Sequence, residues 1–103
     1  MSSEIVRQLT SVFARYPNIE TVYLFGSRAK GNFRDGSDID LAVLAPEMKP
    51  EIFTQLWNEI DALPMVFKVD CLHFEQLEND ALKQKVLNEG VVFYQASSAG
   101  RST

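Results

Sequence analysis

The spacing of apolar residues along the chain predicts three amphipathic helices. In residues 3–16 and again in residues 51–63, apolar side chains recur at helical spacing, and both runs stop at a proline. A third run covers residues 79–88 and ends before Gly90, a residue type common just past a helix C-terminus. Each helix should therefore bury one apolar stripe against a neighbouring layer.

Four shorter segments have the composition of β-strands. Residues 21–25, 38–45, 66–74 and 91–94 are rich in β-branched, aromatic and other apolar side chains. The predicted order is helix, strand, strand, helix, strand, helix, strand. This order indicates an α+β (α/β layered) fold, with a small mixed β-sheet of about four strands and helices packed on one side.

Length and composition are those of one small domain. The chain has 103 residues, of which 46% are hydrophobic and 23% charged. A chain of this size has too little interior for a second independent core, so we expect one domain over residues 1–96. Residues 97–103 form a polar tail that we expect to be flexible.

Charge and cysteine content narrow the classes of partner. The formal net charge is −4, whereas a dedicated nucleic-acid binder carries a basic face, so no direct stable nucleic-acid binding is expected. Cys71 is the single cysteine, which excludes an intrachain disulfide and fits a reducing compartment. The sequence shows no signal peptide and no apolar run of the ~20 residues that span a bilayer, so we expect a cytoplasmic protein with no membrane association.

The segment with the clearest chemistry holds paired aspartates. Asp38 and Asp40 stand two apart in a predicted strand, which puts both side chains on one face, roughly 6.5–7 Å apart. Two carboxylates this close raise each other's pKa unless a cation lies between them, and Mg²⁺ is the natural cation for oxygen ligands. Asp70 interrupts the third predicted strand. If that strand neighbours the second, the site gains a third carboxylate, enough for metal-assisted phosphoryl transfer.

A Gly-Ser step upstream of the aspartates suggests a phosphate site. A strand that ends in Gly26-Ser27 and leads into a helical turn points backbone N–H groups at an incoming anion. The four-residue gap to Gly31 matches a P-loop, but Asn32-Phe33 follows where Lys and Ser or Thr are required, which excludes a Walker site. The candidate nucleotide-binding residues are Gly26, Ser27, Arg28, Lys30 and Ser37.

The same residues also allow plainer interpretations. Asp38 and Asp40 alone could be a solvated strand end, and Gly26-Ser27 an ordinary turn. Cys71 and His73 are better explained as core packing plus a surface histidine than as a zinc pair. Other side chains divide in the same way: Trp57 is expected in the core, whereas Phe33 could touch nucleotide or partner, or fold back on the domain.

Taken together, these motifs resemble a known signature. GSRAKG at residues 26–31 and GSDIDLAV at residues 36–43, followed by a strand aspartate, are similar to the DNA polymerase β-like nucleotidyltransferase superfamily. The closest subgroup is the minimal nucleotidyltransferases of bacteria and archaea, and the resemblance covers about residues 5–94. It implies a polymerase β palm-like nucleotidyltransferase fold.

The resemblance also implies roles for individual residues. Asp38 and Asp40 would ligate two Mg²⁺ ions, and Asp70 would ligate the catalytic ion and help to activate the attacking hydroxyl. Gly26 and Ser27 would cradle the β- and γ-phosphates. A hydroxyl would attack the α-phosphorus, and pyrophosphate would leave. The family often has Arg where this chain has Lys30, which keeps the charge but loses a bidentate fork.

The subgroup further implies a protein partner. Its members work beside a small helical HEPN-type protein and resemble antitoxins that add AMP to a tyrosine of the HEPN toxin. ATP and a HEPN-type partner in a hetero-oligomer are therefore expectations from the resemblance. Two other functions stay open: a non-catalytic antitoxin that blocks its partner sterically, and a transferase that acts on a small molecule or an RNA end.

Overall fold

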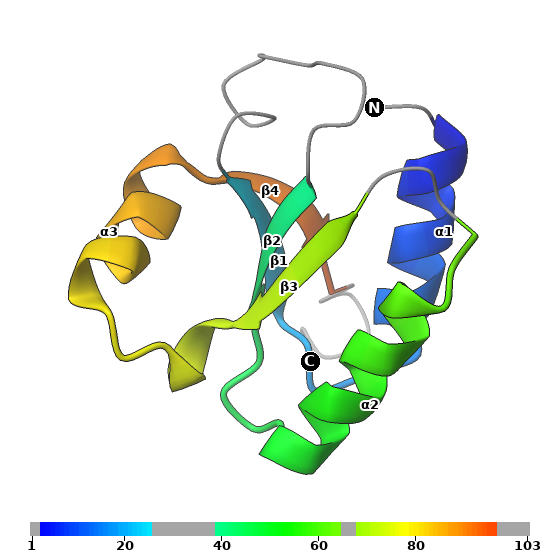
Figure 1. Cartoon of the computed structure of the whole chain (residues 1–103), viewed down its shortest axis with the longest axis horizontal. Helices are drawn as coiled ribbons and strands as arrows, with labels where there is room; N and C mark the ends of the chain where they lie inside the picture. The colour runs from blue at the N-terminus through cyan, green and yellow to red at the C-terminus, as the bar shows by residue number, and fades with distance from the viewer. Residues whose placement is uncertain (1–2, 26–38, 65–67, 97–103) are drawn as a thin grey trace, which may run out of the picture.

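The computed structural model describes residues 3–25, 39–64 and 68–96 (Figure 1). Each predicted helix and strand is present within these ranges, with ends shifted by a few residues. Several residues singled out from the sequence lie outside the described ranges: Gly26, Ser27, Arg28, Lys30, Phe33, Ser37 and Asp38. The polar tail also lies outside them. The elements, in chain order, are α1 (Ser3–Ala14), β1 (Thr21–Phe25), β2 (Ile39–Leu44), α2 (Pro50–Asp61), β3 (Val69–His73), a short 3-10 helix η1 (Phe74–Gln76), α3 (Asp80–Glu89) and β4 (Val91–Gln95).

The described strands form one mixed sheet in the order β3-β2-β1-β4. β1 pairs antiparallel with both β2 and β4, whereas β2 and β3 run parallel. Parallel neighbours cannot be joined by a tight turn, and α2 lies in the connection that brings the chain back to begin β3. The expected mixed sheet of four strands is confirmed.

The helices divide between the two faces of the sheet, which corrects the expectation that they pack on one side. α1 and α2 cover one face, and α3 covers the other (Figure 1). Both faces of the central strands are apolar: Val22 and Leu24 pack toward α1 and α2, while Phe25 and Ala42 pack with Val86 of α3. Strands that are apolar on both faces need a layer on each side to exclude water.

The main core lies between the sheet and the α1–α2 layer. Phe13 of α1 is fully buried, and its ring meets Phe93 of β4 edge-on, with centroids 6.3 Å apart. Trp57 was expected in this core but is 39% exposed on α2, so that prediction is wrong. Leu56 and Ile60 fill the inward face of α2, and Trp57 falls one position to the side of that stripe.

Short polar contacts fix the helix ends and their mutual packing. The Asn79 side chain accepts a hydrogen bond from the backbone N–H of Leu82 at 3.1 Å, a capping contact that starts α3. Arg15 and Tyr16, just past α1, both bond the carboxylate of Glu59 on α2.

Within the described ranges, no helix has both the length and the apolar character needed to cross a membrane.

The turn from α3 into β4 leaves no room for a side chain at Gly90. Its backbone N–H donates to the Val86 carbonyl at 2.8 Å. A Cβ at this position would come within 2.4 Å of the same oxygen and 3.2 Å of the Tyr23 Cβ. Glycine is therefore required here by the close approach of two backbone segments.

We expect Gly90→Ala to lower the free energy of unfolding by about 1–3 kcal/mol, because backbone must move to admit the methyl group. Urea denaturation followed by circular dichroism measures this. Asn88→Ala, at an exposed position of α3, is the matched control and should leave stability unchanged or slightly higher. Equal stability of Gly90→Ala and the parent would show that the turn can open at no cost.

Candidate acidic site at the strand ends

Two of the predicted site aspartates lie side by side in the sheet. Asp40 of β2 and Asp70 of β3 are register partners in the parallel pair. Partners in neighbouring strands are roughly 4.8 Å apart and point to the same face. This is the face that α3 covers further along, where Ala42 and Leu72 contact the α3 layer. Sequence reasoning left the adjacency of these strands open, and the sheet order supplies it.

The end of β1 meets the same place. Phe25, the last residue of β1, is the register partner of Asp40 in the antiparallel pair. The start of β2, the start of β3 and the end of β1 therefore lie at one end of the sheet (Figure 1). Gly26-Ser27 follows Phe25 directly in the sequence, and Asp38 stands two residues before Asp40.

The carboxylate of Asp70 is accessible and loosely paired. Its side chain is 41% exposed, and Oδ1 lies 4.0 Å from Nζ of Lys68, itself 72% exposed. An ion pair of this length and exposure contributes little to stability. Burial, followed by the negative charge of Asp70, raises the pKa of the Cys71 thiol to about 12. The charge of Asp70 is thus felt inside the domain while its oxygens remain open to solvent.

The described residues contain two members of the predicted metal-ligand set. Asp40 and Asp70 are brought together, and Asp38 falls outside the described ranges. Among the residues that the structure describes, no group of three His, Cys, Asp or Glu side chains is placed to hold a metal ion. The predicted nucleotide-binding residues all precede Ile39 and also fall outside.

His73 was predicted at the surface, and that prediction is wrong. It is 6% exposed, its ring stacks on Phe53 with centroids 5.0 Å apart, and Nε2 lies 3.0 Å from the Ala45 carbonyl oxygen. The alternation of β3 carries Cys71 and His73 to the α2 face, where both are buried. Both side chains are therefore packed in the interior, and the predicted core position of Cys71 is confirmed.

Glu75 has a structural role that its sequence context does not indicate. It is the first of three acidic residues, with Glu78 and Asp80, around the start of α3, where acidic side chains are usually solvated. Its Oε1 instead accepts a hydrogen bond from the backbone N–H of Ala45 at 3.0 Å and lies 3.5 Å from Nε2 of His73. Glu75 and His73 thus hold the segment after β2 through the two polar groups of one peptide residue. A charged residue directly after a buried strand is the only sequence signal for it.

Comparisons with known proteins give a consistent fold. The family model described as polymerase beta, nucleotidyltransferase, matches residues 7–99. A chain in the crystal structure of a toxin–antitoxin complex with AMP-PNP is 22% identical, with a TM-score of 0.72, over 93% of this chain and 77% of that one. A chain of the MntA–HepT toxin–antitoxin complex is 20% identical, with a TM-score of 0.68, over 97% and 78%.

A third similar structure contains a modified toxin. A chain in the complex of a tri-AMPylated Shewanella oneidensis HEPN toxin with an MNT antitoxin is 20% identical, with a TM-score of 0.67, over 98% of this chain and 78% of that one. The search of curated proteins gave no match. At these identities the structural likeness shows the fold, and the family rests on the match over residues 7–99.

We expect the Cys71 thiol to resist alkylation while the domain is folded. With a pKa of about 12, roughly one thiol in ten thousand is ionised at pH 8, and the thiolate is the reactive form. Mass spectrometry after iodoacetamide treatment measures the modified fraction, and the same protein in urea is the control that should react fully. Rapid modification of the folded protein would contradict both the burial of the Cys71 side chain and the raised pKa of its thiol.

Proposed function

This chain belongs to the polymerase beta nucleotidyltransferase family, and on that basis we propose that it transfers AMP from ATP to a hydroxyl group of a partner protein. The observation that carries the proposal is the Asp40–Asp70 register pair. Placing two like charges side by side in a sheet is unfavourable unless a positive charge, such as a bound cation, offsets their repulsion. A domain that only packed against a partner would gain nothing from this pair.

The triphosphate would bind where β1 ends. Phe25 pairs with Asp40, so the chain enters Gly26-Ser27 directly beside the acidic pair. Backbone N–H groups and the Ser27 hydroxyl at such a step would donate hydrogen bonds to the β- and γ-phosphates. Arg28, Lys30 and Ser37 are proposed to contribute further charge and hydrogen bonds to the phosphates.

The carboxylates suit a hard divalent cation. Asp40 and Asp70 offer an all-oxygen donor set on one face, and the Asp70 oxygens are open to solvent. We propose that these two residues and Asp38 hold two Mg²⁺ ions. The ions would neutralise the triphosphate and lower the pKa of the acceptor hydroxyl. Buried Cys71 and His73 lie toward the opposite face and take no part in this donor set.

The transfer step follows from the same placement. The acceptor oxygen forms a bond to the α-phosphorus of ATP, the bond from that phosphorus to the bridging oxygen of the β-phosphate breaks, and pyrophosphate leaves. Asp70 is proposed to receive the proton of the hydroxyl, because its carboxylate is solvent-accessible at the start of β3. Positioning and charge neutralisation would supply most of the rate acceleration.

A HEPN-type protein is the proposed acceptor. Support comes from the similar structures, one of which is a complex with AMP-PNP and another a complex with a tri-AMPylated HEPN toxin. The net charge of −4 on this chain favours a basic protein surface over a bare polyanion as the partner. The chain would then act as an antitoxin by modifying its partner.

We expect Asp40→Asn and Asp70→Asn each to lower AMP transfer roughly a hundredfold or more, because each removes charge that the reaction needs. The rate is measured with ATP radiolabelled at the α-phosphate. Glu47→Gln is the control, since Glu47 is exposed beyond the other end of β2, and it should leave transfer unchanged. Transfer that survives both Asn variants would remove these aspartates from the site.

The acceptor can be identified in the same assay with a lysate of the host. We expect label on one small protein, loss of that label on chelation with EDTA, and no label with the Asp40→Asn variant. Absence of label while a co-purified partner stays bound would replace the proposal with steric inhibition. Label on RNA or on a small molecule would move the acceptor to another class.

A further inference from the structure

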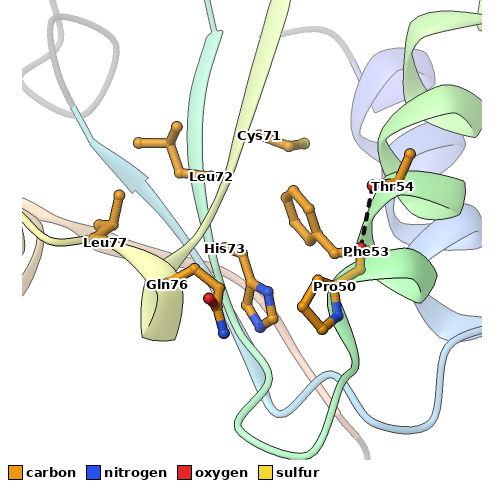
Figure 2. Close-up of a pocket in the computed structure, with 8 residues that line it drawn as sticks. All are labelled: Pro50, Phe53, Thr54, Cys71, Leu72, His73, Gln76 and Leu77. Carbon is orange, nitrogen blue, oxygen red and sulfur yellow. Dashed lines mark hydrogen bonds between the residues drawn. The ribbon is translucent and has the colours of Figure 1, made fainter.

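A groove runs along the outer edge of β3, away from the acidic pair of Asp40 and Asp70 and toward the end of the strand. Its volume is about 370 Å³. Figure 2 shows its two sides: Pro50, Phe53 and Thr54 of α2 stand on one, and Leu72, Gln76 and Leu77 on the other. We call it the β3-edge groove.

The floor of the β3-edge groove is the backbone of an edge strand. β3 is the outermost strand of the described sheet. The backbone N–H of Ile39 donates to the Lys68 carbonyl at 2.9 Å, and successive residues of a strand turn their polar groups to opposite sides. The N–H and C=O groups of Cys71 and the N–H group of His73 therefore face away from β2, toward the groove, whereas the His73 carbonyl begins the 3-10 helix η1. No strand within residues 3–25, 39–64 and 68–96 pairs with them.

The walls are spaced for side chains that alternate. Leu72 points to the α3 face, where it joins the cluster around Val86, while Phe53 packs on His73 on the α2 face. An added strand points successive side chains to opposite faces. Its neighbouring residues would thus meet Phe53 on one side and Leu72 or Leu77 on the other. This match between floor and walls favours an extended polypeptide over a compact ligand.

An exposed acidic residue flanks each wall of the groove. Glu51 follows Pro50 and Glu78 follows Leu77, so each stands next to one wall, and both are exposed. The carboxylate of Glu75 in η1 is engaged with Ala45 and His73, and Lys49, before Pro50, is an exposed cation beside the α2 wall. An occupant with basic residues near the end of β3 would complement this rim.

We propose that the β3-edge groove binds an extended segment of a partner protein as an added strand, with apolar residues in the groove and basic residues at the rim. The segment would form main-chain hydrogen bonds to Cys71 and His73 and place alternate side chains against Phe53 and Leu72. The groove lies on the strand that carries Asp70, yet binding there does not require the transfer reaction.

The probe is a short fluorescein-labelled peptide of alternating valine and threonine that ends in lysines, titrated into the full chain and followed by anisotropy. Two further peptides carry N-methyl groups on one or the other alternating set of backbone amides. A β-strand addition is broken by methylation of the set that faces β3 and tolerates the other. Binding that is lost with one set and kept with the other is the expected result. Equal effects of the two sets, or no binding of the parent peptide, overturn the proposal.

Substitutions on α2 locate the site. Thr54→Arg fills the groove from an exposed wall position and should weaken binding about tenfold or more. Asn58→Arg, one turn further along α2 and outside the lining, adds the same side chain and should leave binding unchanged. Equal effects of the two variants would place the peptide elsewhere.

Charge reversal tests the rim. The double variant Glu51→Lys with Glu78→Lys should weaken binding of the lysine peptide and strengthen binding of a peptide that ends in glutamates. Indifference to the exchange contradicts a basic occupant. The Asp40→Asn variant, inactive in transfer under the proposed function, should bind the peptide normally. A parent chain that transfers AMP but does not bind the peptide contradicts only the groove proposal. A parent chain that binds the peptide but does not transfer AMP contradicts only the proposed function.

Discussion

The parallel register between β2 and β3 is the constraint on which the rest of the molecule depends. It sets Asp70 beside Asp40 on one face, and it sends Cys71 and His73 into the interior on the other. A slip of one residue would exchange the faces. The Asp70 carboxylate would then enter the α1–α2 core, where a buried unpaired charge is costly, and Cys71 and His73 would lose their buried positions on that face.

Several contacts at the opposite end of the two strands stabilise this register. His73 and Glu75 each bond a polar group of Ala45, just past β2, and Phe53 stacks on the His73 ring. These contacts fix where β3 ends relative to β2, and therefore which residue of β2 lies beside Asp70. The contacts of buried His73 at one end of β3 thus help to set the position of the Asp40–Asp70 pair at the other end. With helices on both faces of the sheet, the proposed reaction would take place at the strand ends.

Sequence patterns were sufficient for the elements and insufficient for their arrangement. Periodicity predicted each helix and strand, because amphipathic stripes and apolar runs are local properties. The pairing of Asp40 with Asp70 depends on sheet order, a non-local property, so adjacency stayed conditional. The same gap explains two wrong predictions: His73 is buried because of what covers its face, and α3 packs on the opposite side of the sheet from the other helices, where one side was expected for all three. Trp57 lies at the border of the apolar stripe of α2. Helical spacing does not decide whether a residue at such a border is buried, because that depends on what packs against the helix.

The position of β1 between β2 and β4 has a consequence for how the chain is made. Of the four described strands, β1 is synthesised first, and its second neighbour, β4, is synthesised last. Until β4 emerges, one side of β1 offers open hydrogen-bonding groups beside an apolar surface. Such an edge is a template for pairing with other chains. During that stage, folding of the nascent domain competes with pairing of the open edge of β1 with other chains.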